Sequence, residues 1–304
     1  MPKRVRYHEL PTEQSHPHRR PLDRLSVPSL LRLMTAEDQR VIQAVARQHA
    51  PIARAIELTA HALRRGGRLW LVGAGTSGRL GVLEAAECPP TFHTSPTLIQ
   101  AMMAGGRAAV FRSREGAEDH RPSARRLIHR KVRSGDIVVG ISASGVTPFV
   151  EEALRAATRR GATPLLITCH PSAPIPARVR IVLRVGPEVL AGSTRLKAGT
   201  ATKLVLNMLT LGTMVQLGKT YGQLMVDVRP TSRKLRARAI RIIRSLTSCS
   251  ERAAAATLRA ARGRVKLAVL MLNDGLSSMA AHRRLASAHG SLREALNDGV
   301  MRNA

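Results

Sequence analysis

The chain has 304 residues, and 44% of them are hydrophobic, which is enough to form the cores of about two domains. Lysine and arginine outnumber aspartate and glutamate by 49 to 20, so the formal net charge is +29. No stretch approaches the roughly 18 consecutive apolar residues of a membrane-spanning helix, and the sequence therefore predicts no membrane partner.

The high positive charge suggests nucleic-acid binding, but two observations oppose it. Only 2% of the residues are aromatic, which leaves few side chains to stack on bases. The basic residues are also spread along the chain rather than gathered in one tail. We therefore predict no nucleic-acid partner.

Three cysteines, Cys88, Cys169 and Cys249, are scattered along the chain. An odd, scattered set suits a reducing cytoplasm better than a disulfide framework. No pair has the spacing of metal ligands, so we expect a cytoplasmic protein with no metal site.

The first 58 residues begin as a proline-broken loop and continue as a helix from Ser29, where apolar residues recur at helical spacing. Short apolar runs then predict strands at 69–72, 98–103, 136–142, 163–168 and 178–185. Helical patterns between and after them predict helices at 77–88, 115–132, 148–160 and 197–217. This alternation predicts an α/β fold, a three-layer α-β-α sandwich with a mostly parallel sheet whose strand ends share one edge.

After Val228 the pattern changes to helices alone, and Pro230 marks the boundary. The periodicity predicts five short helices, at 235–246, 250–261, 264–272, 277–288 and 291–296. They are numerous enough for a small helical domain. The predicted organisation is an N-terminal segment at 1–58, a sheet domain at 59–222 and a helical domain at 230–304.

The first candidate site is the glycine-rich segment Gly73–Leu80, which follows a strand and opens a helix. Its glycines allow close approach to the backbone, and the free N–H groups of a helix start attract anions. The glycine spacing also matches a dinucleotide loop, but no acidic residue follows where a ribose would require one. The hydroxyls of Thr76 and Ser77 favour phosphate binding, with a simple helix cap as the alternative.

Two further polar turns precede later helices, and hydroxyl groups dominate both of them. Alone, each turn is compatible with an ordinary helix cap. The turn at 142–147 and the first loop would place two hydroxyl-rich turns at the same sheet edge, which favours a phosphorylated ligand. The hydroxyls and the lysine at the later helix start suit anion binding, with a capped helix and a solvated lysine as the alternative. The side chains concerned are those of Ser142, Ser144, Thr147, Ser193, Thr194 and Lys197.

Two carboxylates are candidates for proton transfer, because acidic residues are scarce in this chain. Glu87 lies near the end of the first loop's helix, which Pro89 and Pro90 are expected to stop. The negative end of the helix dipole would favour its protonated form. Glu118 follows the second predicted strand. An acid and a base on opposite sides of a sugar could carry out an elimination.

These motifs together resemble the N-acetylmuramic acid 6-phosphate etherases of the sugar isomerase (SIS) superfamily. The similarity covers nearly the whole chain. It is densest in the run Gly-Ala-Gly-Thr-Ser-Gly-Arg-Leu-Gly followed by Glu-Cys-Pro-Pro, and in Leu-Lys-Ala-Gly-Thr-Ala. The helical tail is similar to the UBA-like C-terminal domain of that family.

The resemblance implies cleavage of the D-lactyl ether of N-acetylmuramic acid 6-phosphate in cell-wall amino sugar recycling, with no cofactor. By motif, Glu87 corresponds to the proton donor and Glu118 to the second acid/base, while the three polar loops hold phosphate and sugar. A homodimer is also implied.

Two other functions compete with the etherase. The related glucokinase regulatory protein binds phosphosugars without turnover, and a non-catalytic phosphosugar-binding regulator would need neither carboxylate. A phosphosugar-responsive DNA-binding regulator would need a helix-turn-helix ahead of the sheet domain, and the first 58 residues have too few helices for one. The presence of both carboxylates favours the enzyme.

Overall fold

The computed structural model describes residues 7–301, and the chain divides into two compact units. The sheet unit comprises Met1–Ala86 and Thr97–Thr210, and the helical unit comprises Glu87–Pro96 and Leu211–Ala304. Helices α3 (Gly75–Phe92) and α7 (Lys197–Gln216) each have residues in both units. The predicted domain boundaries at 58 and 222 remain predictions, and residue 58 falls within helix α2 (His49–Arg64).

The sheet unit contains five parallel strands in the order β2-β1-β3-β4-β5. Each strand is short and apolar, as expected when both faces of a parallel sheet are covered. All five predicted strands are confirmed to within a few residues, although β5 is shorter than expected. Their bounds are Leu69–Gly73 (β1), Ile99–Met103 (β2), Ile137–Ile141 (β3), Thr163–Thr168 (β4) and Val179–Val182 (β5).

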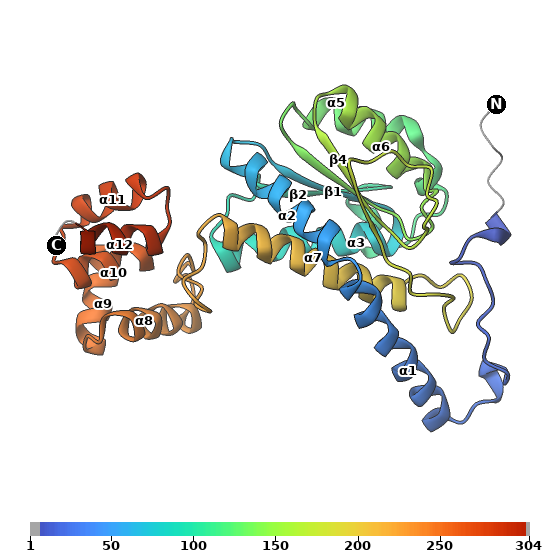
Figure 1. Cartoon of the computed structure of the whole chain (residues 1–304), viewed down its shortest axis with the longest axis horizontal. Coiled ribbons are helices and arrows are strands. Elements are labelled where there is room, and N and C mark those ends of the chain that lie inside the picture. The colour runs from blue at the N-terminus through green and yellow to red at the C-terminus, as the bar shows by residue number, and fades with distance from the viewer. Residues whose placement is uncertain (1–6, 302–304) are drawn as a thin grey trace. The chain divides into compact units, whose positions relative to one another are not determined.

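Helices cover both faces of this sheet, which confirms the predicted sandwich (Figure 1). Helices α5 (Arg121–Lys131) and α6 (Pro148–Arg159) lie on one face, where Trp70 and Phe149 are fully buried in the core. Helix α2 and the sheet-unit parts of α3 and α7 lie on the other face (Figure 1). The N-terminal segment adds α1 (Val27–Ala46) before α2.

The prediction that α3 stops at Cys88 is wrong, because the helix continues through Pro89 and Pro90 to Phe92. The prolines remove two backbone donors, yet their φ suits a helix, and the ladder resumes where His93 N donates to Pro89 O at 3.0 Å. Cys88 and Phe92, one turn apart, are both buried. We attribute the continuation to this packing, which outweighs the lost hydrogen bonds.

A continuous helix over 115–132 is also not observed. Gly116 has a φ of +73°, a left-handed conformation that interrupts a helix, and a single 3-10 turn follows at Ala117–Asp119. Helix α5 begins only at Arg121. Glu118 therefore lies in a tight turn ahead of the helix rather than within it.

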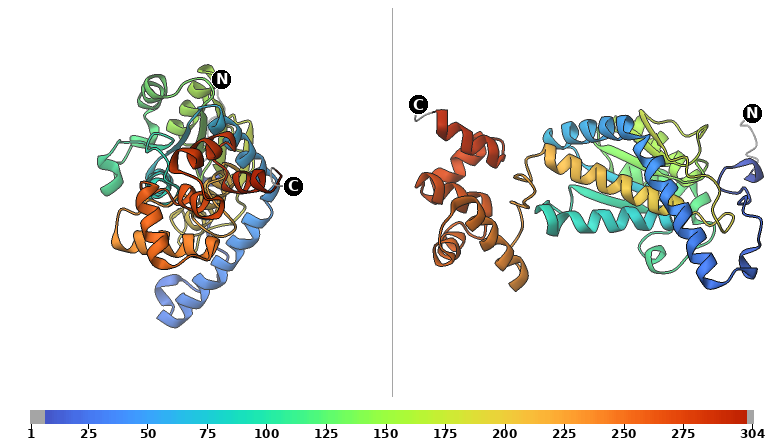
Figure 2. Two further views of the ribbon diagram at one scale, coloured as in Figure 1. Left: turned by 90° about the vertical axis from the view of Figure 1, so that its left-hand side faces the viewer. Right: turned by 60° about the horizontal axis from the view of Figure 1, so that its bottom comes forward.

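The helical unit contains the five predicted helices, which Figure 2 draws at its C-terminal end. Their core includes Val226 and Val228. Serine hydroxyls cap the starts of four of them, because each accepts an N–H from three residues later. The distances are 3.2 Å for Ser232, Ser250 and Ser277 and 3.3 Å for Ser291. The helices are Arg233–Thr247 (α8), Glu251–Ala260 (α9), Val265–Asp274 (α10), Ser278–Ser287 (α11) and Leu292–Met301 (α12).

Candidate functional site

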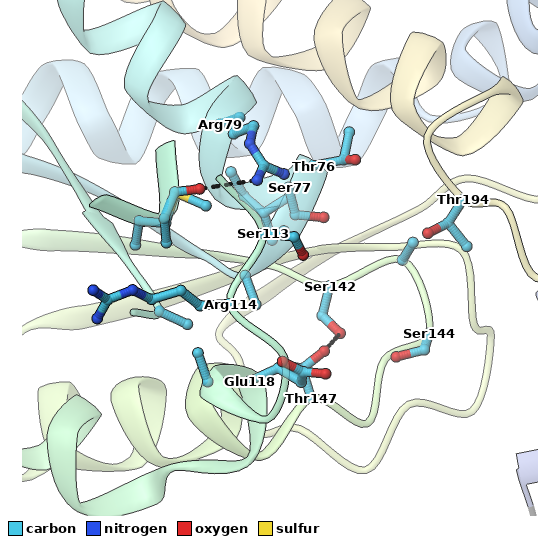
Figure 3. Close-up of a pocket in the computed structure, with 18 of the residues that line it drawn as sticks. Thr76, Ser77, Arg79, Ser113, Arg114, Glu118, Ser142, Ser144, Thr147 and Thr194 are labelled. Atoms are coloured by element: carbon cyan, nitrogen blue, oxygen red, sulfur yellow. Dashed lines mark hydrogen bonds between the residues drawn. The ribbon is translucent and has the colours of Figure 1, made fainter. Parts of the chain in front are cut away.

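A pocket of about 280 Å³ lies where the loops after β1 and β3 meet, at the carboxyl edge of the sheet. Figure 3 shows hydroxyl side chains from both loops facing this pocket. Open α/β sheets bind ligands at this edge. Six of the predicted site residues from the polar loops line it, namely Thr76, Ser77, Ser142, Ser144, Thr147 and Thr194.

The first loop owes its shape to a close backbone contact between two glycines. A Cβ on Gly73 would lie only 2.7 Å from the backbone nitrogen of Gly78, so no side chain fits there. Helix α3 starts within the loop, at Gly75. Thr76 and Ser77 are therefore in its first turn, where unpaired backbone N–H groups favour an anion.

The second loop is ordered by its own hydroxyls. Ser142 is buried, and its Oγ lies 2.8 Å from Oγ1 of Thr147 and accepts the N–H of Gly145 at 3.1 Å (Figure 3). Thr147 occupies the N-cap position of α6, but its side chain makes no capping hydrogen bond. The hydroxyl is thus directed to Ser142 and the pocket rather than to the helix.

The third loop contributes Thr194 to the pocket but neither Ser193 nor Lys197. Lys197 is buried, and its ammonium group pairs with the buried carboxylate of Glu37 on α1. Glu188 accepts the N–H groups of Lys197 and Ala198 at 3.0 and 2.9 Å, which caps α7. These contacts anchor both ends of the segment that carries Thr194.

The charge of Glu37 is maintained despite its burial. Burial alone would raise the pKa of Glu37. Lys197, His16 and Arg40 together lower that pKa by more than burial raises it, so the net pKa lies below its ordinary value of 4.5. Nε2 of His16 lies 3.3 Å and Nη1 of Arg40 lies 2.9 Å from this carboxylate. Glu37 thus joins the N-terminal segment, α1 and the start of α7.

Three carboxylates line the pocket: Glu118, Glu115 and Glu13. Figure 3 shows Glu118 directed into the same space as Ser142 and Thr147. Glu13 was not predicted from the sequence; the segment that carries it is held by the Gly192 N–H, which donates to Thr12 O at 3.1 Å. The family resemblance covers nearly the whole chain, including the segment of Thr12 and Glu13, and it was the one signal that pointed to this residue.

Two arginines in the pocket were also missed. Arg79 is fixed by hydrogen bonds from its guanidinium group to the carbonyls of Val110 and Ala109, both 2.9 Å long. The side chain of Arg114 makes no hydrogen bond or ion pair within residues 7–301. In a chain with so many arginines, neither position stands out in the sequence.

Glu87 does not line this pocket, and its side chain is exposed. It follows Gly75 by twelve residues of the same helix, which corresponds to about 18 Å at the rise of an α-helix. Leu83, one turn earlier, is also exposed (43%). The dipole argument for Glu87 weakens, because the helix ends more than a turn beyond it.

The cysteines and possible metal ligands add no further chemistry. Cys88 and Cys169 are buried, and burial together with Glu188 raises the pKa of Cys169 to about 12, so it is a poor nucleophile. Within the described part of the chain, no group of three or more His, Cys, Asp or Glu side chains could hold a metal ion. No helix among those residues is long and apolar enough to cross a membrane.

Comparison of the chain with known proteins identifies its family. A model of the glucokinase regulatory protein N-terminal SIS domain matches residues 51–158, and a SIS domain model matches residues 121–212. The N-acetylmuramic acid 6-phosphate etherase of Gloeobacter violaceus is 53% identical over 299 residues, 97% of each chain. Those of Crocosphaera subtropica and Trichormus variabilis are 50% and 51% identical, over 95% and 94% of each chain. Since this identity extends over almost the full length of both partners, the chain belongs to the N-acetylmuramic acid 6-phosphate etherase family.

Proposed function

We propose that the protein cleaves the D-lactyl ether of N-acetylmuramic acid 6-phosphate, giving N-acetylglucosamine 6-phosphate and D-lactate in amino sugar recycling. The observation that carries this proposal is one pocket that combines phosphate-type loops with the carboxylate of Glu118. Full-length similarity to etherases supports it. The three cysteines form no disulfide within residues 7–301, which is compatible with a reducing cytoplasm as the location.

Residues 59–222 then act as the phosphosugar-binding domain. Thr76 and Ser77 at the start of α3, and Ser144 and Thr147 before α6, supply hydroxyl donors beside free backbone N–H groups. Ser142 orders its loop through its hydrogen bonds, and Thr194 lines the pocket from the third loop. Lys197 contributes by anchoring Thr194, because its ammonium group is already paired with Glu37. Ser193 lies within that anchored segment.

The reaction is an elimination followed by addition of water. The sugar opens to its aldehyde, which acidifies the proton on C2. A base removes that proton, the C2–C3 double bond forms, and the C3–O bond breaks as an acid protonates the departing D-lactate oxygen. Water then adds to the unsaturated aldehyde, with hydroxyl at C3 and a proton at C2. No electrons are gained or lost overall, so acid/base groups suffice.

Glu118 is the acid/base within the pocket, and Glu87 is the proton donor. About 18 Å of helix separates Glu87 from the first loop of its own chain, so we infer that it acts in the pocket of a second copy. An exposed apolar stripe on α1 supports a homodimer. Helix α1 projects from the rest of the sheet unit (Figure 2), and Val27, Leu31 and Ile42 on one side of it are 58–69% exposed.

The test is D-lactate release from N-acetylmuramic acid 6-phosphate by wild type, Glu87→Gln and Glu118→Gln. Each substitution should lower turnover by about 10²–10⁴-fold, the usual contribution of a general acid or base. Glu57→Gln, an exposed glutamate on α2, is the matched control and should retain full activity. Phosphosugar binding without lactate release from wild type would instead support the non-catalytic regulator.

Mixing the two inactive variants tests the shared site. If each pocket uses Glu118 of one chain and Glu87 of the other, hybrid dimers contain one intact pocket and should recover up to about a quarter of wild-type turnover after subunit exchange, the statistical limit for random pairing. A mixture that stays inactive while subunits demonstrably exchange would rule out the shared arrangement.

A further inference from the structure

The helical unit has a pocket of its own, with a volume of about 340 Å³. Four basic side chains line it, those of His93, Lys219, Arg264 and Lys266, with Asp227 as the one acidic residue among the lining groups. None of these residues lines the hydroxyl-rich pocket of the sheet unit. The reaction proposed above leaves this second pocket unexplained.

The single carboxylate of this pocket is already shared by two lysines. Lys266 is buried, and its ammonium group donates to Oδ2 of Asp227 at 2.7 Å and to the carbonyls of Gly218 and Gly290 at 2.8 and 2.7 Å. Nζ of Lys219 lies 3.2 Å from the same Oδ2. Asp227 thus has little capacity left to neutralise another cation.

Arg264 is the remaining cation. It is exposed, and its guanidinium group has no hydrogen bond or ion pair within residues 7–301. Counting Lys219, Arg264 and Lys266 against Asp227 gives three positive charges and one negative charge, a net charge of +2 even with His93 neutral.

The neighbouring ionisable groups respond to this excess of positive charge. Burial lowers the pKa of Lys266, and Lys219 and Arg264 lower it further, although Asp227 opposes them. Burial and the cations Arg229, Lys219 and Arg264 likewise lower the pKa of His93, again against Asp227. A net-positive, partly desolvated pocket attracts anions more strongly than exposed basic residues do.

We propose that this pocket is a second ligand site, which binds the phosphate group of a small molecule. The charge of a phosphate dianion matches the net charge of the lining groups. Arg264 offers a planar pair of N–H donors for bidentate contact, and Lys219 offers a compact charge beside it. The volume lies within the range of small-ligand pockets, and Val226 and Val228 provide an apolar wall for the rest of the molecule.

The test is calorimetric titration of the full-length protein with inorganic phosphate at low ionic strength. Arg264→Gln should bind one phosphate fewer per chain than wild type, or bind it at least tenfold more weakly. Because Arg264 is exposed and unpaired, this variant should fold normally. Lys219→Gln/Arg264→Gln should abolish the site. The control, Arg252→Gln/Arg259→Gln, removes two exposed charges from α9 outside the pocket and should bind like wild type.

The outcomes separate this site from the first pocket. If the hydroxyl-rich pocket also binds phosphate, Arg264→Gln reduces two sites to one; if it does not, the variant reduces one site to none. Lactate release without added phosphate should be the same in Arg264→Gln and wild type. Equal phosphate binding by wild type and both pocket variants would overturn the proposal, as would an equal loss in the α9 control.

Parallel titrations identify the source of the phosphate. Tighter binding of glycerol 3-phosphate than of inorganic phosphate would indicate a phosphorylated metabolite, and the reverse order would indicate free phosphate. Both results support the site. Binding of D-lactate with no binding of either phosphate would overturn the assignment of a dianion.

Discussion

The amino and carboxyl edges of the sheet differ in whether their polar side chains bond to the protein or remain available to a ligand. At the amino edge, the carboxylate of Asp136 is fully buried and every contact is internal. It accepts hydrogen bonds from the backbone and guanidinium group of Arg68, from the indole N–H of Trp70 at 3.0 Å, and from the backbone N–H of Arg133 at 3.1 Å. Both carboxylate oxygens of Asp136 therefore accept hydrogen bonds from the protein itself.

At the carboxyl edge, the hydroxyl groups are only partly used. Ser142 and Thr147 bond to each other, while Thr76 has no side-chain hydrogen bond within residues 7–301. The comparison shows that a parallel sheet can be stabilised at one edge and left open for binding at the other. Substitutions at the two edges should therefore separate stability from activity.

The largest effect on stability is expected from Asp136→Ala. Removal of the buried carboxylate leaves Arg68 and the indole N–H of Trp70 without their partner, which should cost about 3 kcal/mol of unfolding free energy. Urea unfolding measures the loss, and Asp38→Ala on α1, an exposed carboxylate, is the control. Since the pocket is at the opposite edge, lactate release by the folded fraction should be unchanged; a large fall in its turnover would contradict the separation of the edges.

Lys197→Met should affect both properties, because Lys197 is buried yet anchors Thr194 at the pocket. Loss of the buried ammonium partner should cost about 2–3 kcal/mol in unfolding free energy, although Arg40 and His16 still contact Glu37. The KM for substrate should rise more than kcat falls. In a double-mutant cycle, Lys197→Met/Glu37→Gln should be less destabilised than the sum of the single changes. Simple additivity would show that the pair does not act as a unit.

The same pair predicts how stability depends on pH. The pKa of Glu37 is lowered in the folded protein, so its contribution is complete above its unfolded value of 4.5 and is lost as pH falls through the folded value. Melting temperatures measured downward from neutral pH should decrease in acid for wild type. Glu37→Gln should start lower and decrease less. Parallel curves for the two proteins would count against this linkage.

The smallest effect on stability is expected from Thr76→Val. Since its hydroxyl makes no hydrogen bond to the described residues 7–301, unfolding free energy should change by less than about 0.5 kcal/mol. The KM should nevertheless rise about tenfold, through loss of one hydrogen bond to a charged phosphate. Thr158→Val on α6, whose hydroxyl bonds to Leu154 O outside the pocket, should leave KM unchanged. An unaltered KM in Thr76→Val would remove the first loop from the phosphate site.

Local sequence patterns were sufficient to predict most of the fold. The five apolar runs became the five strands, because a parallel sheet buried on both faces needs continuous apolar stretches. The two errors, at Pro90 and at Gly116, have a common cause. Local rules assign helix ends from residue types alone. In the structure, packing allows α3 to continue beyond its prolines, and the left-handed conformation of Gly116 makes α5 begin later than predicted.

The alternation of strands and helices along the chain was enough to predict that the polar loops lie at one sheet edge and that Glu118 follows the second strand. Contacts between residues far apart in the sequence could not be predicted in this way, because no local sequence pattern depends on them. Only the tertiary structure placed Glu13 at the pocket, paired Lys197 with a carboxylate 160 residues away, and left Glu87 exposed on its helix. The chain's local chemistry determines which groups can act, and long-range packing decides which of them face a ligand.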